Sequence, residues 1–170
     1  MKIHFKTYSL LVLLASLLFA GCRIEPIEDP NNPGVGPLST NATLSEIQNL
    51  VDGAEAAMRN NLGTYYDDVS VIGREYYRFS TSDPRFTSDL LGKENAVLDN
   101  NTFYITNPYG ARYRVIRNLY ILMDAVQNTK ATITDAQKKA TVAYAKTIQA
   151  HQLLMVYNLL YNNGIRVDVR

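Results

Sequence analysis

The clearest pattern of apolar and polar positions lies in residues 134–163, which we expect to form one long helix. Thr134 and Gln137 have the spacing of a capping box, in which each side chain binds a free backbone N–H group of the other residue. Neither Pro nor Gly interrupts this stretch, and Gly164 follows it where a helix end favours glycine. The second half is apolar on almost every side, through Leu153, Leu154, Met155, Val156, Leu159 and Leu160. Because such a helix must be covered all round, we expect the chain to be the front part of a larger protein or of a complex.

Two stretches nearer the middle of the chain also have helical spacing. The first follows a second capping box, formed by Thr43 and Glu46, and we expect this helix to end at Gly63. Its apolar stripe consists of Leu44, Ile47, Leu50, Val51, Ala54, Ala57 and Met58. The second stretch predicts a helix over residues 66–78, which Gly73 weakens.

A further helix is predicted over residues 108–127, with Pro108 at a position that suits a helix start. A short turn over residues 128–133 joins it to the final helix, so the two should form an antiparallel hairpin. The pattern contains no strand longer than a few residues. The predicted fold class is therefore all-α.

Residues 79–107 show no sustained periodicity and are rich in Ser, Thr, Asp and Asn. A loop of this length inside a compact domain is usually functional or disordered. Phe79, Phe86, Phe103 and Tyr104 indicate that this loop is ordered, because aromatic side chains bury large apolar surfaces.

The N-terminus has the pattern of an export signal. Lys2 and Lys6 precede an uncharged apolar segment, residues 8–20, which is too short to span a bilayer. The segment ends in FAGC at 19–22, which resembles the lipobox of bacterial lipoproteins. This resemblance implies that a signal peptide, residues 1–21, is removed and that Cys22 carries the lipid anchor. The alternative is an ordinary signal peptide with an incidental Cys.

Residues 22–42 contain four Pro and several Gly and Asn, a composition typical of an extended, lipid-anchored flexible tether. Glu25, Glu28 and Asp29 resemble the acidic signals that direct some lipoproteins to the outer face of the outer membrane. The folded domain is expected over residues 43–170.

Composition narrows the classes of function. The formal net charge of +1 gives no electrostatic reason to expect a nucleic-acid partner, and one Cys excludes an internal disulfide. Asp67 and Asp68 form a possible Ca²⁺ corner but lack the repeated oxygen donors of a calcium loop, so we expect them to be solvated. His151 has no partner at metal-ligand spacing. We therefore predict no metal site and no cofactor.

Four stretches together resemble the RagB/SusD family of nutrient-uptake outer-membrane lipoproteins. They are GREYYRF at 73–79 with SDPRF at 82–86, LDNNTFY at 98–104, ARYRVIRN at 111–118 and NGIRVDV at 163–169. The resemblance implies a scaffold of tetratricopeptide-like helix pairs, of which residues 43–170 would be the N-terminal, truncated part. It also implies a lipid-anchored, surface-exposed protein of the outer membrane that captures oligosaccharides or related nutrients. The implied partner is a SusC-like TonB-dependent transporter.

Sugar binding requires flat aromatic faces and planar polar side chains, and the long loop offers both. The candidate ligand-binding residues are Tyr77, Arg78, Asp83, Arg85, Phe86, Asn101 and Tyr104. A role in the core is an equal alternative for the aromatic residues.

Two other functions remain open. The chain could be a structural lipoprotein that docks on a barrel without binding a ligand. It could also be an accessory glycosidase using Glu75, Asp83 or Asp89. We predict binding without catalysis and no catalytic residue, because solvated carboxylates are the usual state of acidic loop residues. We expect Arg112, Arg114 and Arg117 to pair with acidic loop residues such as Asp83 or Asp89 and so pin the loop to the helix.

Overall fold

The computed structural model describes residues 34–78, 83–160 and 162–169, and the helices described here belong to a unit that runs from Gly34 to Arg170. The described residues form helices and turns without a strand, which confirms the predicted all-α class. The helices are α2 (Val35–Asn41), α3 (Leu44–Ala57), α4 (Leu62–Ile72), α5 (Phe103–Asn128) and α6 (Asp135–Leu159), with short 3₁₀ turns η1 (Pro84–Phe86) and η2 (Lys93–Asn95). The predicted signal peptide, Cys22 and most of the tether lie outside the described residues.

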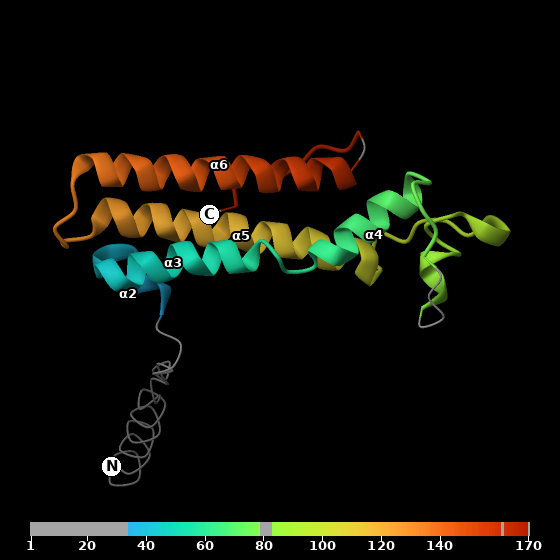
Figure 1. Ribbon diagram of the computed structural model, residues 1–170, viewed down its shortest axis with the longest axis horizontal. Helices are drawn as coiled ribbons and strands as arrows, with labels where there is room; N and C mark the ends of the chain where they lie inside the picture. Colours follow the sequence, from blue (N-terminus) through green and yellow to red (C-terminus); the bar gives the residue numbers. More distant parts are fainter. Residues whose placement is uncertain (1–33, 79–82, 161, 170) are drawn as a thin grey trace, which may run out of the picture. The chain divides into compact units, whose positions relative to one another are not determined.

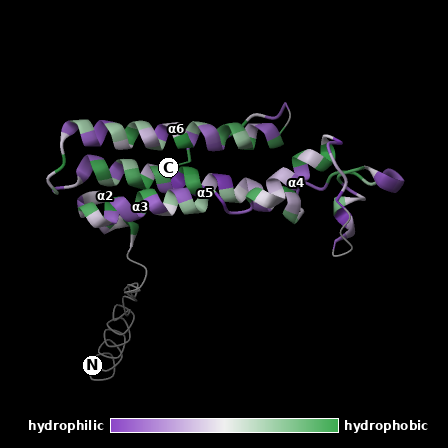
Figure 2. Ribbon diagram, viewed as in Figure 1, coloured by the Kyte–Doolittle hydropathy of each residue, from purple (hydrophilic) through white to green (hydrophobic). Residues whose placement is uncertain are grey.

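Helix α5 is central, because α2, α3, α4 and α6 all pack against it (Figure 1). Helices α5 and α6 run antiparallel and form the predicted hairpin. Hydrophobic residues alternate with hydrophilic ones along both helices, as Figure 2 shows. On α5, Val115, Leu119, Leu122 and Val126 form one buried stripe that packs with Ala54 of α3 and Ala145 of α6. Their spacing of three and four residues places them on one helix face.

The predicted capping boxes are present at the starts of α3 and α6. In α6, the Thr134 N–H group donates to Gln137 Oε1 at 2.8 Å, and the Gln137 N–H group donates to Thr134 Oγ1 at 3.2 Å. Helix α6 ends at Leu159, earlier than predicted. The chain turns at Leu160, whose carbonyl accepts the Asn163 N–H group at 2.9 Å.

The predicted boundary between the first two helices is wrong. Helix α3 ends at Ala57, and Asn61 adopts a left-handed conformation with φ of 53° before α4 begins at Leu62. Asn tolerates this conformation better than most residues. Gly63 therefore lies in the first turn of α4. Gly73 caps the other end, where its N–H group donates to Val69 O at 2.9 Å.

Helix α5 begins at Phe103, so the prediction that Pro108 starts it is wrong. A proline inside a helix removes one backbone hydrogen bond, which favours a helix end. Here Tyr104 and Pro108, four residues apart, are both fully buried on the same face of α5. Burial of this added turn offsets the lost hydrogen bond.

The last part of the predicted tether is helical and packed, which corrects its boundary at residue 42. Helix α2 covers Val35–Asn41, and Ala42 after it is buried. The end of α5 holds this segment, because Thr129 Oγ1 donates to Ala42 O at 2.5 Å and Asn128 Nδ2 donates to Ser39 O at 3.0 Å. The composition of residues 35–42 resembles a linker, but distant contacts with α5 fold it.

The apolar second half of α6 is only partly covered. Met155 and Val156 are buried, whereas Leu154 and Tyr157 are 57% and 52% exposed. The expected covering of α6 on every side is therefore absent among the described residues.

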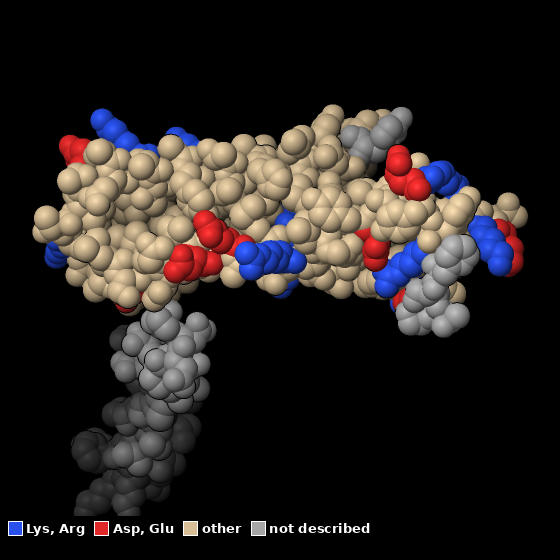
Figure 3. Space-filling model, in the orientation of Figure 1, with Lys and Arg blue, Asp and Glu red and all other residues tan. Residues whose placement is uncertain are grey.

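On the face shown in Figure 3, charged side chains form small groups, and most of the surface is uncharged.

Candidate functional site

The described part of the long loop before α5, residues 83–102, packs against the helices, as Phe86, Phe103 and Tyr104 predicted, whereas Phe79 lies outside the described residues. Phe86 and Leu90 of the loop pack with Val71 of α4 and Tyr104 of α5 in a small buried cluster. Phe86 and Tyr104 therefore take the core role that the sequence left open, and neither presents a free ring face to a sugar. The side chain of Phe103 contacts both rings edge-on, with centroid separations of 5.4 and 5.7 Å.

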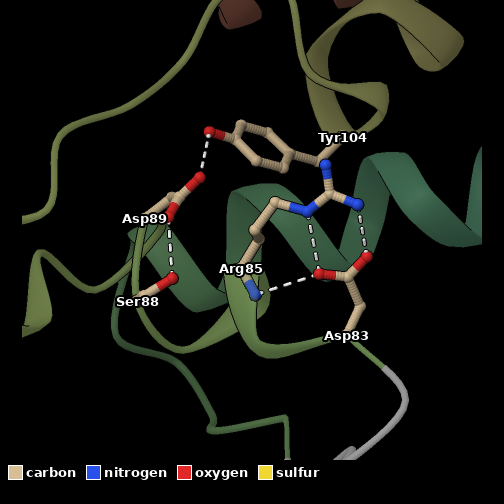
Figure 4. A network of polar contacts seen from close by, with 5 residues as sticks. All are labelled: Asp83, Arg85, Ser88, Asp89 and Tyr104. Carbon is tan, nitrogen blue, oxygen red and sulfur yellow. Dashed lines mark hydrogen bonds and ion pairs between the residues drawn. The ribbon is translucent and has the colours of Figure 1, made fainter.

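Two other candidate residues, Asp83 and Arg85, bind each other (Figure 4). Arg85 donates to the Asp83 carboxylate from Nε at 2.9 Å and from Nη2 at 2.6 Å, and its backbone N–H group donates at 3.0 Å. These hydrogen bonds lower the pKa of Asp83 to about 2. The pair caps η1 and holds the carboxylate in its ionised form.

The hydroxyl of Tyr104 bridges two parts of the loop, and Figure 4 shows its bond to Asp89. It donates to Asp89 Oδ2 at 3.0 Å and accepts the backbone N–H group of Asp99 at 2.8 Å. Ser88 donates to the other oxygen of Asp89 at 2.7 Å. The candidate Asn101 lies in the same turn, where its N–H group donates to Asp99 Oδ1 at 2.9 Å. This network fixes the loop backbone and leaves the Asn101 side chain exposed.

Arg78 and Tyr77 lie where the loop leaves α4. Arg78 forms an ion pair with Asp67, and its guanidinium lies 3.8 Å from the centre of the Phe86 ring. The Tyr76 hydroxyl also donates to Asp67, at 2.7 Å. Asp67 is therefore bonded rather than solvated as predicted. Tyr77 is 59% exposed and is the candidate aromatic residue that presents a surface.

Arg112 does not pair with acidic loop residues, so that prediction is wrong. It is fully buried, and its Nη1 donates to Met58 O at 2.8 Å and to Gln152 Oε1 at 3.0 Å, while Nη2 donates to Asn60 O. The last carbonyls of a helix lack partners within the helix, and a cation near them is favourable. The guanidinium thus caps the C-terminal end of α3. A signal was present, because Arg112 lies at helical spacing between Pro108 and Ile116 on the buried face.

Asp68 is a second buried charged residue that the sequence analysis misassigned as solvated. Its side chain is fully buried on α4, and neither carboxylate oxygen has a hydrogen-bond partner among the described residues. Burial, with the neighbouring Asp67 adding to it, raises the pKa of Asp68 to about 7. Its spacing of three residues from the buried Tyr65 and Val71 could have indicated this position.

One pocket of about 370 Å³ lies between the α3–α4 junction and α6. Arg112 and Gln152 contribute polar groups, and Met58, Leu62 and Ile148 contribute apolar ones. At its rim the Tyr144 hydroxyl donates to Glu55 Oε1 at 3.2 Å. His151 is exposed here and its Nδ1 lies 2.9 Å from Gln152 Nε2.

A second pocket, of about 360 Å³, lies between α5 and the segment 164–169. We call it the α5 pocket; its lining residues are Tyr109, Gly110, Tyr113, Arg114, Arg117, Arg166 and Val169. Arg114 and Arg117 were expected to pair with acidic loop residues, but within the described part of the chain neither forms an ion pair. None of the described residues that line the pocket is acidic.

Within residues 34–78, 83–160 and 162–169, no group of three His, Cys, Asp or Glu side chains could hold a metal ion. None of the helices described is long and apolar enough to cross a membrane. Comparison with protein-family models, with curated proteins and with solved structures finds no match to this chain.

Proposed function

We propose that this chain is a binding module, a surface lipoprotein of the outer membrane that captures oligosaccharides or related nutrients for a SusC-like TonB-dependent transporter. The observation that carries the proposal is the described part of the loop between α4 and α5, which packs against the helices and keeps apolar side chains on its surface. Tyr77, Val97 and Leu98 are 59%, 79% and 53% exposed, although buried residues and the Tyr104 network hold the loop in place. An ordered loop that exposes apolar groups is typical of an interaction site.

Two features of the sequence give this module its proposed place in the cell. The signal-like N-terminus with Cys22 supports export and lipid anchoring, and the four stretches similar to RagB/SusD proteins support nutrient uptake. The antiparallel α5–α6 hairpin is compatible with the tetratricopeptide-like helix pairs that this resemblance implies. On this proposal the helices form a scaffold and the loop and the surface pockets contact the ligand.

The loop carboxylates support binding better than hydrolysis. A general acid needs a pKa near the working pH, whereas Arg85 holds Asp83 ionised with a pKa of about 2. Asp89 is engaged by Ser88 and Tyr104. We therefore propose that these residues shape the loop and do not transfer protons.

Ligand capture can be tested on the full chain in detergent by isothermal calorimetry with a panel of oligosaccharides. We expect saturable binding that Tyr77→Ala weakens at least tenfold, because this change removes the exposed ring from the loop. Tyr157→Ala on α6 is the matched control, since its ring is similarly exposed at 52%. If the Tyr77→Ala variant binds with unchanged affinity, the loop does not contact the ligand and this part of the proposal is wrong.

The exposed apolar residues of α6 favour the second candidate function, docking on a barrel without ligand capture. In that case no oligosaccharide would bind, and Leu154→Ser with Tyr157→Ser would abolish co-purification with the transporter. Intact mass of the membrane-extracted protein tests the anchor separately. Processing before Cys22 with added acyl chains is the expected result, and an unmodified Cys22 would refute lipidation.

A further inference from the structure

We propose that the α5 pocket binds a carboxylate-bearing sugar, such as a uronic acid unit of an oligosaccharide. The proposed function supplies the reason to expect a sugar, and the inference rests on it. The residues that line the pocket supply the reason to expect a negative charge on that sugar. It assigns a ligand class and a site that differ from the loop candidates.

The pocket is built by helical spacing and by one anchored segment. Tyr109, Tyr113 and Arg117 follow one another at intervals of four residues and so share a face of α5. The chain returns to this face after α6, where the Tyr113 hydroxyl donates to Arg166 O at 2.9 Å and accepts the Arg166 N–H group at 3.2 Å. These two bonds close the pocket on its second side.

The electrostatics of the lining are one-sided. Among the described residues that line the pocket, Arg114, Arg117 and Arg166 contribute three guanidinium groups and none is Asp or Glu; Asp168 of the closing segment is not a lining residue. The Arg166 guanidinium donates to Asp168 O through Nε at 2.7 Å. Its two terminal nitrogens do not take part in this hydrogen bond. Like charges gathered in one concave site repel one another, and an anion placed between them removes this cost. Guanidinium groups match the planar carboxylate with paired hydrogen bonds.

The tyrosines favour a sugar over a small inorganic anion. The rings of Tyr109 and Tyr113 lie 4.8 Å apart with an angle of 54° between their planes. Both side chains are half-buried, so each presents part of an apolar ring surface, and the Tyr113 hydroxyl is held by the Arg166 backbone. The volume of about 360 Å³ lies at the lower end of the range for small-molecule sites. A sugar ring would use the tyrosine surfaces while its carboxylate binds the arginines.

Gly110 provides a way to close the pocket without damaging the fold. It lines the pocket, and a Cβ atom added at this position meets nothing within 4 Å. A side chain here enters the space of the ligand and not that of the protein. Replacing Gly inside a helix also removes a conformational penalty, so the variant should melt at the same or a higher temperature.

The test is calorimetry of the full chain in detergent with trigalacturonic acid and with its fully methyl-esterified form, which has the same sugars without the charges. We expect the acid to bind saturably and the ester to bind at least tenfold more weakly. Raising the salt concentration should weaken the binding of the acid, because salt screens the attraction between its carboxylates and the arginine side chains. Arg114→Gln and Arg117→Gln should each reduce the affinity at least tenfold, and Gly110→Leu should abolish binding while the melting temperature holds. Lys130→Gln, which removes an exposed cation that lines neither this pocket nor the one beside Arg112, is the matched control and should bind normally.

Equal binding of acid and ester would overturn the anionic assignment and leave nutrient capture standing. Binding of the acid that Gly110→Leu does not change would place the site elsewhere and also overturn the inference. Competition by inorganic phosphate at concentrations similar to the sugar acid would refute the role of the tyrosine surfaces. Failure of the wider proposal looks different, since then no oligosaccharide, charged or neutral, binds the chain.

Discussion

The buried carboxyl of Asp68 predicts a specific dependence of stability on pH. It is fully buried on α4 without a hydrogen-bond partner among the described residues, and its pKa in the folded protein is about 7. In the unfolded chain the pKa of an Asp side chain is about 3.9. Between these values the unfolded chain releases a proton that the folded protein keeps. The contribution of Asp68 to stability is therefore greatest below about pH 4, falls as the pH rises toward 7, and is constant above it.

The change Asp68→Asn removes this titration while keeping the shape of the side chain. The amide is buried at every pH, so its own burial cost is the same at pH 5 and at pH 8. The difference between the two pH values isolates the carboxyl. Wild type loses stability over the two pH units from 5 to 7, at about 1.4 kcal/mol for each unit. The effect of Asp68→Asn on the free energy of unfolding should therefore be more favourable at pH 8 than at pH 5 by roughly 3 kcal/mol.

Urea unfolding followed by circular dichroism at pH 5 and pH 8 measures this difference. Asp52→Asn is the control, because this side chain is exposed and its change should have nearly the same effect at both pH values. An equal effect of Asp68→Asn at the two pH values would refute the reasoning. It would mean that water reaches the Asp68 carboxyl in the folded protein or that another group donates a hydrogen bond to it.

Three further predictions concern single side chains that hold the helices and the loop. Arg112→Met should lower the free energy of unfolding by about 3 kcal/mol in urea titrations, because it leaves the buried carbonyls at the end of α3 without a donor. Thr134→Ala should cost about 1 kcal/mol by removing the capping box of α6, whereas Thr147→Ala inside the same helix should cost nothing. Tyr104→Phe should cost about 1–3 kcal/mol and speed amide exchange at Asp99, whose N–H group loses its acceptor.

Each of these results has a clear contrary outcome. Wild-type stability of Arg112→Met would mean that other donors cap α3. Equal losses for the two threonine changes would show that the hydroxyl at the start of α6 has no special role. Unchanged exchange at Asp99 in Tyr104→Phe would mean that water or another acceptor already binds this amide.

The parts of the fold that depend on neighbouring residues could be predicted from the sequence. The capping boxes at Thr43 and Thr134 join residues three positions apart, and the α5–α6 hairpin follows from two periodic stretches and a short turn. Pro108 misled the prediction because its local cost is visible, while the burial that offsets it depends on the fold. Helix α2 was missed for the same reason, since α5 supplies its contacts from almost ninety positions away.

The candidate site was predicted less well because residue types alone do not separate a binding surface from a core. Phe86 and Tyr104 are suited to stack on a sugar, but they fill the space between α4 and the loop. The charges of Arg112 and Asp68 led to the prediction that both lie at the surface, but both lie on buried helix faces. Spacing against the apolar stripes was the better guide at these positions. The α5 pocket could not have been predicted, because it depends on the return of residues 164–169 to α5.

The short connection between α5 and α6 also has a consequence for the order of folding. Bringing the ends of this connection together restricts only six residues, whereas docking α2 on the end of α5 closes a loop of 89 residues. Closure entropy rises by about 0.6 kcal/mol with each doubling of length, so the longer closure costs roughly 2 kcal/mol more. Local contacts of this kind form early, and distant ones form once a partner surface exists. The hairpin should therefore act as the nucleus on which α3 and then α2 assemble, and its amides should be the last to exchange with solvent when the protein opens.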